Sequence, residues 1–209
     1  MTKSQIVLAI ESAICGGSIS LLRDGVEVAN WIGKSDVSKA EDLLVNIDAM
    51  LTANDIDRQE INMIAVSAGP GSFTGIRIGI ATALGMKAGL GIAMSSRSAL
   101  KAMAFLQTKN KVTTAIPMGR KAVCLQSFQK QGKKIYVLDE PHTMPEDAFL
   151  SLLQNETNVT FVLHSALYYK TEQQGHIINF GDNIAYAIGL ICCEYQGIVS
   201  EPIFVSKSF

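Results

Sequence analysis

The sequence predicts an α/β protein made of two lobes, each with the element order βββαβα. Apolar residues switch between strand-like runs and helical spacing along the chain, and the order of the first half recurs loosely in the second. The chain has 209 residues, about 1.4 times a typical domain of about 150, which suits two lobes of roughly a hundred residues each. We place the lobes at residues 1–106 and 107–209, with the boundary beside the polar stretch 107–111.

Three strands are expected at the start of the first lobe: residues 5–10, 18–22 and 26–32. They form a meander because Asp24-Gly25 is a strong signal for a two-residue hairpin turn. The apolar period then becomes helical behind a capping box of Ser38 and Glu41, which predicts an amphipathic helix over residues 38–54.

The remaining elements of the first lobe begin with a buried strand over residues 61–67 and a glycine-rich turn over residues 69–75. A long helix follows, which starts at residue 73 or 74 and ends at residue 90, and then a short strand over residues 92–95. The second lobe repeats the order more loosely. Its expected strands are residues 113–117, 122–129, 134–138 and 159–163, and its expected helices are residues 145–154 and 183–195.

Composition excludes several classes of protein. Hydrophobic residues make up 48% of the chain and charged residues 18%, which excludes intrinsic disorder. Eighteen Lys and Arg against 19 Asp and Glu leave a net charge of −1. The chain therefore lacks the basic excess of a domain that binds nucleic acid by itself, and we expect contact with tRNA only through a partner.

Apolar patterning and cysteine spacing predict a cytoplasmic protein that does not enter a membrane. The long apolar stretches 76–94 and 184–198 both contain charges and glycines, so neither is typical of a membrane span. The first apolar run ends at Glu11 without a small-residue cleavage site, as a buried strand does and a signal peptide does not. The cysteines at positions 15, 124, 192 and 193 lack metal-ligand spacing, so we expect neither zinc nor disulfides.

The glycine-rich turn carries the most informative motif. Its residues are Gly69, Pro70, Gly71, Ser72, Phe73, Thr74 and Gly75. Glycine permits positive φ and close backbone approach, and a hydroxyl at the start of a helix suits a cap. Free N–H groups at the helix start would also suit an anion, although no P-loop lysine follows. Capping and phosphate binding therefore stay open as alternatives.

The helix behind this turn has small residues on two faces. Gly75, Gly79 and Ala83 form one face, and Ala81, Gly85 and Gly89 form another. Because glycine costs a helix up to about 1 kcal/mol relative to alanine, we expect something to pack very closely against it. The sheet of the same lobe explains one face, and a second helix across an interface would explain the other.

Three segments together resemble the TsaB (YeaZ) family. They are VLAIESAICGGSISLLRDG, KAEDLLVNIDAMLTANDIDRQEINMIAVS and GPGSFTGIRIGIATALGMKAGL. The resemblance extends over roughly residues 5–100, and the GPGSFTG core is highly specific to TsaB and its paralogue TsaD. The second lobe is similar in order and in two faint places, TAIPMGRKAVCLQSF and EPIFVS. The resemblance implies an actin/Hsp70-type (ASKHA), ribonuclease H-like fold in a subunit of the bacterial machinery that makes threonylcarbamoyladenosine in tRNA.

The resemblance also implies partners. It predicts a noncatalytic chain that binds and activates a TsaD-like subunit, with a TsaE-like ATPase in the assembly, ATP and metal on the partner subunits, and a homodimer when the chain is alone. The helices at residues 38–54 and 74–90 would form the interface. We assign to it Leu43, Ile47, Met50, Gly75, Gly79, Ala83 and Met86.

Departures from the family pattern argue against a catalytic role for this chain. The family's Ile-Asp-Thr after the first strand is Ile10-Glu11-Ser12 here, and its His-Ser-Glu appears as residues 39–41, Lys-Ala-Glu. The paired histidines of TsaD are absent, because the histidines at positions 142, 164 and 176 have no i, i+4 pairing. We therefore assign no metal ligand and no catalytic residue, and expect these histidines to be solvated or in the core.

Two enzyme classes remain as alternatives to the partner subunit. An ATP-using ASKHA enzyme would place Glu11 and the 69–75 loop near the nucleotide, but the second lobe shows no second phosphate loop. A ribonuclease H-like nuclease needs several convergent carboxylates, and Glu11 is the lone acid at a strand end. The partner subunit is the favoured hypothesis, with Glu11 as the one candidate nucleotide residue.

Overall fold

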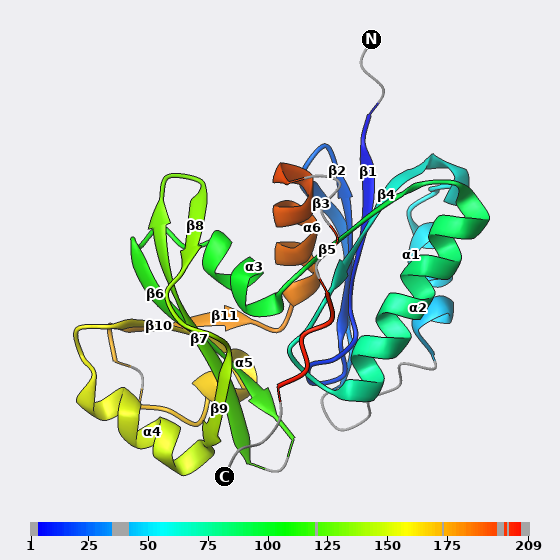
Figure 1. The fold of residues 1–209 in the computed structure, drawn as a ribbon. Coiled ribbons are helices and arrows are strands. Elements are labelled where there is room, and N and C mark those ends of the chain that lie inside the picture. Colours follow the sequence, from blue (N-terminus) through cyan, green and yellow to red (C-terminus); the bar gives the residue numbers. More distant parts are fainter. Residues whose placement is uncertain are drawn as a thin grey trace.

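Two β-sheets stand side by side, with helices between them and on both outer faces (Figure 1). The computed structural model describes residues 4–34, 42–119, 121–172, 174–195, 199 and 201–205. Its helices are α1 (Leu43–Ala53), the 3₁₀ turn η2 (Arg58–Glu60), α2 (Phe73–Leu90), α3 (Ala99–Phe105), α4 (Glu146–Asn155), α5 (Ser165–Tyr168) and α6 (Ile184–Glu194). No helix in these ranges is long and apolar enough to cross a membrane.

The first sheet is built from β1 (Ile6–Glu11), β2 (Ser18–Arg23), β3 (Val26–Ile32), β4 (Ile61–Ser67) and β5 (Ala93–Arg97). Its strand order is β3-β2-β1-β4-β5. The three opening strands pair antiparallel through short turns. The strands β4 and β5 add in parallel, which requires crossover connections, and α1 and α2 lie in these connections.

The second sheet repeats this topology. Its strands are β6 (Lys111–Met118), β7 (Ala122–Gln131), β8 (Lys134–Val137), β9 (His142–Pro145), β10 (Thr160–His164) and β11 (Ile177–Gly181). The order β11-β10-β6-β7-β8 places β6, β7 and β8 where the first sheet has β1, β2 and β3, and β10 and β11 where it has β4 and β5. The predicted recurrence of the element order is therefore confirmed.

Because side chains alternate in direction along each strand, the two faces of the first sheet pack into two different hydrophobic cores. Ile6, Leu8 and Ile10 of β1 pack in the outer core, which α1 and α2 cover. Val7 and Ala9 point the other way, into the core between the two sheets. A third core lies under α4 and α5 on the far face of the second sheet. The molecule thus has five layers, with helices in the first, third and fifth (Figure 1).

The helices of the middle layer cross between the lobes. The helix α3 follows the first sheet in sequence but packs on β6 and β7 of the second, and α6 ends the second half of the chain but packs on β1 and β2 of the first. A Cβ added at Gly189 of α6 would lie 2.6 Å from Cδ1 of Leu22 and 3.1 Å from Cβ of Ala9. Glycine therefore allows α6 to approach the first sheet this closely, and one shared core ties the lobes together.

The predicted strands and helices are present, with ends that differ by a few residues. The predicted capping box of Ser38 and Glu41 lies outside the described residues, within which the first helix begins at Leu43. The sequence analysis missed α3, β9, α5 and β11. The start of α3 was predictable, because serine is a preferred residue type at the N-cap of a helix. The hydroxyl of Ser98 caps α3 by accepting a hydrogen bond from the backbone N–H of Lys101 at 3.3 Å.

Candidate functional site

The glycine-rich loop at residues 69–75 packs directly on the loop that follows β1. A Cβ added at Gly75 would lie 2.2 Å from the carbonyl oxygen of Ser12, and one at Gly71 would lie 2.6 Å from Cβ of Ala13. A Cβ at Gly79 would lie 2.3 Å from Oγ of Ser12. Packing within the lobe therefore accounts for the small residues on this face of α2.

Three backbone N–H groups of the loop are bound inside the chain. The N–H of Ser72 donates to the carbonyl oxygen of Ala13 at 2.8 Å, and the N–H of Gly69 donates to Oγ of Ser67 at 3.1 Å. The hydroxyl of Ser72 accepts from the N–H of Gly75 at 3.3 Å and so caps α2. These contacts favour the capping interpretation of the motif over the phosphate-binding one.

Glu11 is engaged with the backbone of its own loop. Its side chain is 2% exposed, and its Oε1 accepts a hydrogen bond from the N–H of Ala13 at 2.6 Å. Burial raises the pKa of Glu11 to about 8, although the backbone N–H groups of Ala13 and Ile14 oppose this rise. The carboxyl group thus steadies the loop on which residues 69–75 rest and is not open to solvent between the lobes.

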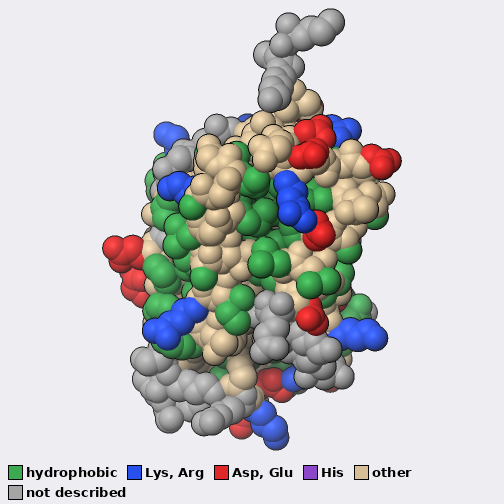
Figure 2. Space-filling model, turned by 90° about the vertical axis from the view of Figure 1, so that its right-hand side faces the viewer, with side chains coloured by type: hydrophobic (Ala, Val, Ile, Leu, Met, Phe, Trp, Pro, Cys, Tyr) green, Lys and Arg blue, Asp and Glu red, His purple; other side chains and the backbone are tan. Residues whose placement is uncertain are grey.

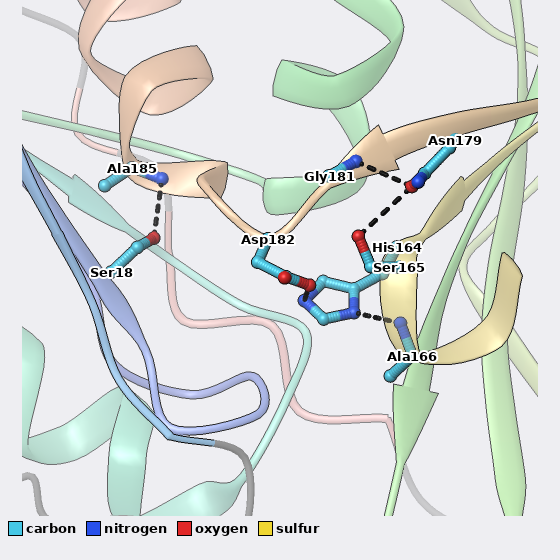
Figure 3. Close-up of polar contacts among 8 residues, drawn as sticks. All are labelled: Ser18, His164, Ser165, Ala166, Asn179, Gly181, Asp182 and Ala185. Carbon is cyan, nitrogen blue, oxygen red and sulfur yellow. Dashed lines mark hydrogen bonds and ion pairs between the residues drawn. The ribbon is translucent and has the colours of Figure 1, made fainter. Parts of the chain in front are cut away.

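A small cavity of about 220 Å³ opens between the lobes, lined by Cys15, Gly33, His164, Ser165, Ala166, Tyr169 and Asp182. In it, Nδ1 of His164 accepts a hydrogen bond from the N–H of Ala166 at 3.1 Å, and Nε2 lies 3.5 Å from Oδ1 of Asp182 (Figure 3). Because Nδ1 accepts, Nε2 carries the proton of the neutral ring and points it at Asp182. Burial lowers the pKa of His164, and the charge of Asp182 opposes that shift.

The polar groups of this cavity do not form a nucleophile and base pair. The hydroxyl of Ser165 donates to Oδ1 of Asn179 at 3.1 Å and not to the imidazole of His164 (Figure 3). The pKa of the Cys15 thiol is raised to about 11 by burial and by the charges of Glu11 and Asp182, which is the reverse of an activated thiol. Within the described residues, no three His, Cys, Asp or Glu side chains are arranged to hold a metal ion.

Hydrogen bonds from α6 fix the position of this cavity. The N–H of Ala185 donates to Oγ of Ser18 at 3.0 Å (Figure 3). Asn183 donates to Glu27 at 2.8 Å and accepts from the hydroxyl of Ser20 at 2.9 Å. The sequence analysis missed the cavity because its residues come from segments far apart in the chain, and no local spacing links them.

The second small-residue face of α2 lies open. A Cβ added at Gly85 or Gly89 would meet nothing within 4 Å. The side chains of Leu44 and Val45, both on α1, are 57% and 67% exposed. Figure 2 shows hydrophobic side chains gathered on this side of the molecule.

These residues belong to a groove of about 830 Å³ between the two helices. We call it the α1–α2 groove, and its lining is Leu44, Val45, Ile47, Asp48, Leu51, Arg58, Ala81, Thr82, Gly85, Met86, Gly89 and Leu90. Asp48 and Arg58 form an ion pair there.

The structure shows where the residues predicted for the interface lie, and two of them, Ile47 and Met86, line the α1–α2 groove. The side chains of Leu43, Ile47 and Met50 are buried in the outer core of the first lobe. Gly75, Gly79 and Ala83 are buried too, and Met86 is partly buried. The predicted residues are therefore mainly the inward face of the helix pair, and its exposed face is formed by neighbours such as Leu44, Val45, Leu84 and Gly85.

The exposed face of α2 continues to the start of the helix. The guanidinium carbon of Arg77 lies 3.8 Å from the centre of the Phe73 ring, and the Phe204 ring centre lies 4.8 Å from that of Phe73. The C-terminal segment is held there because the N–H of Ile203 donates to the carbonyl oxygen of Ala68 at 2.7 Å. An exposed aromatic cluster thus adjoins the motif.

Comparison with known proteins agrees with this architecture. The chain resembles a crystal structure of an uncharacterized protein with similarity to peptidase YeaZ from Pseudomonas aeruginosa, with a TM-score of 0.67 and 16% identity, over 95% of this chain and 100% of that one. Two sheets of repeated topology that share a middle layer of helices define an ASKHA-type (actin/Hsp70-like) fold.

Sequence comparison identifies the family. The family model described as TsaD, tRNA N6-adenosine threonylcarbamoyltransferase, matches residues 37–197. The tRNA threonylcarbamoyladenosine biosynthesis protein TsaB of Bacillus subtilis (strain 168) is 26% identical over 167 residues, which are 78% of this chain and 73% of that protein. The protein of the same name from Escherichia coli (strain K12) is 35% identical over 98 residues, 47% of this chain and 42% of that protein. The chain belongs to the family that the TsaD model describes. Within it, the chain is a divergent member of the TsaB (YeaZ) type.

Proposed function

We propose that this chain is a cytoplasmic, noncatalytic partner subunit that binds and activates a TsaD-like subunit in tRNA threonylcarbamoyladenosine biosynthesis. The observation that carries the proposal is the pair of open glycines, Gly85 and Gly89, inside α2. Each costs the helix about 1 kcal/mol relative to alanine. A partner helix packed along the α1–α2 groove would offset this cost, because small residues let two helix backbones approach closely.

The chemistry of the groove supports a protein partner. Leu44 and Val45 supply exposed apolar surface, and the Asp48–Arg58 ion pair lies among the groove's lining residues. Apolar surface with charged groups in the same patch is a common composition of protein–protein interfaces. The names of the curated relatives support a role in this pathway, and the match of this chain to the TsaD family model supports a TsaD-related complex.

The same groove can pair with a second copy of the chain. A two-fold dimer uses one surface patch on both protomers, so the homodimer and the complex with the TsaD-like subunit would compete. A TsaE-like ATPase, ATP and metal belong to the partner's side of the assembly.

The geometry gives less support to an ATP-using enzyme. Such an enzyme would need Glu11 and the amides of residues 69–75 to face a nucleotide. Glu11 instead accepts from the N–H of Ala13, and loop amides such as that of Ser72 donate within the chain.

Co-purification with the host's TsaD homologue tests the proposal. We expect Leu44→Asp and Val45→Asp, both at residues that line the groove, to weaken the complex by about 10- to 100-fold, because a charge would be buried in the centre of the interface. Leu138→Asp and Val26→Asp are matched controls, since Leu138 and Val26 are 49% and 66% exposed but lie outside the groove.

Two results would contradict the proposal. One is a wild-type chain that does not bind the TsaD homologue at micromolar concentration. The other is equal weakening by the groove variants and by the two controls, with all variants folded by circular dichroism.

A further inference from the structure

A pocket of about 420 Å³ lies between the lobes, away from the α1–α2 groove and from the His164 cavity. It is lined by Arg97 and Ser98 at the end of β5, Lys101 of α3, Lys134, Ile135 and Tyr136 of β8, and Ile191 and Tyr195 at α6. Three of these residues are cationic and none is acidic. A chain with a net charge of −1 thus concentrates positive charge at this place.

Arg97 anchors the pocket. Its side chain is 5% exposed, and Nη1 donates to the carbonyl oxygen of Ser96 at 2.7 Å and to Oγ of Ser95 at 3.4 Å. Nη2 donates to the carbonyl oxygen of Tyr195. These contacts hold the guanidinium in one orientation, so its positive charge is fixed at this place in the pocket wall.

Lys101 and Lys134 bring further positive charge from two other elements. Lys101 is half-buried on α3, and its pKa is lowered by burial and by the charge of Arg97. Lys134 is exposed on β8. Glu194, which is next to Tyr195 in sequence, is bound by the neighbouring Lys133 at 2.8 Å.

We propose that this pocket binds the phosphate group of an organic anion, with Lys101 and Lys134 as its cationic contacts and the buried Arg97 as a further positive charge. Charge-assisted hydrogen bonds from arginine and lysine suit phosphate oxygens. The partly exposed ring of Tyr136 provides a surface on which a base stacks. The volume suits a nucleotide-sized ligand. The phosphate belongs either to a free mononucleotide or to an RNA backbone, because both present the same group.

Titration calorimetry on the full chain tests the site with two probes, AMP and a short single-stranded RNA. We expect Lys101→Gln and Lys134→Gln each to weaken binding of the responding probe by about tenfold, the loss of one charge-assisted hydrogen bond. Lys109→Gln is the control, because Lys109 is an exposed lysine in the turn after α3 and does not line the pocket. If RNA is the ligand, each pocket variant also reduces the slope of log K against log salt by about 0.7.

The outcomes separate the sources of the phosphate. Binding of AMP alone identifies a mononucleotide, and binding of RNA with the reduced salt slope identifies a backbone. The proposal is overturned if the wild-type chain binds neither probe, or if Lys109→Gln weakens binding as much as the pocket variants while all remain folded. The measurement needs no TsaD-like subunit, so its failure would leave the proposed partner interface intact.

Discussion

The hydroxyl of Ser12 donates to the carbonyl oxygen of Gly75 at 2.8 Å, and this contact joins the loop after the first strand to the first turn of α2. The two residues are 63 positions apart in the chain. Their contact turns Gly75, Gly79 and Ala83 inward. In this orientation of α2 about its axis, Gly85 and Gly89 face outward.

Alanine substitutions on the two faces of α2 should have opposite effects on the free energy of unfolding. Gly75→Ala should destabilise the chain by about 1–3 kcal/mol, because its Cβ would meet the carbonyl oxygen of Ser12. Gly85→Ala should stabilise it by about 0.5–1 kcal/mol, because its Cβ meets open space. Urea unfolding of both variants measures these changes, and a shared sign would refute the assigned orientation of α2.

Removal of the helix cap should cost about 1 kcal/mol. Ser72→Ala deletes the oxygen that accepts from the N–H of Gly75 at 3.3 Å. Thr74→Ala is the control, because Thr74 is exposed within the same first turn. The midpoint of chemical denaturation should fall for Ser72→Ala and stay near wild type for Thr74→Ala. An unchanged midpoint in both variants would show that the cap does not stabilise the loop.

Glu11 should make the stability of the chain fall as the pH rises. Its pKa is raised from an ordinary 4.5 to about 8 by burial, so the folded state keeps a proton that the unfolded state releases. Relative to Glu11→Gln, the wild type should lose stability between pH 4.5 and 8, by at most about 1.4 kcal/mol per pH unit. Thermal melts across this range provide the measurement. Parallel curves for the two proteins would contradict the assigned burial of the carboxyl group.

His164 should act in the opposite direction at lower pH. Burial lowers its pKa below the ordinary 6.5 in the folded state, so the unfolded state binds the proton first. The stabilising contribution is present above pH 6.5 and is lost as the pH falls through the folded-state pKa. His164→Asn keeps an acceptor for the N–H of Ala166 but removes the titration. Below pH 6.5 the wild type should therefore lose stability faster than this variant, and equal losses would argue against a buried neutral imidazole.

Much of the fold was predictable from local pattern. The hairpin turn at Asp24-Gly25 and the cap at Ser72 come from nearest neighbours in the chain, and both are present. The short elements α5 and β11 were missed because Ser165–Tyr168 and Ile177–Gly181 are too brief for a periodic signal. The helix α3 is apolar on nearly all sides, so its residue pattern does not indicate which side faces the core.

The sequence by itself determined the βββαβα order common to both lobes, the glycine-rich motif and the presence of two small-residue faces on α2. Only the tertiary structure decided which face turns inward, because that choice depends on the contact between Ser12 and Gly75. It also brought His164 beside Asp182, and Arg97 beside the end of α6. Local hydrogen bonds and hydrophobic periodicity select helices and strands. Contacts between residues distant in sequence depend on how whole elements pack, and no local pattern records that packing.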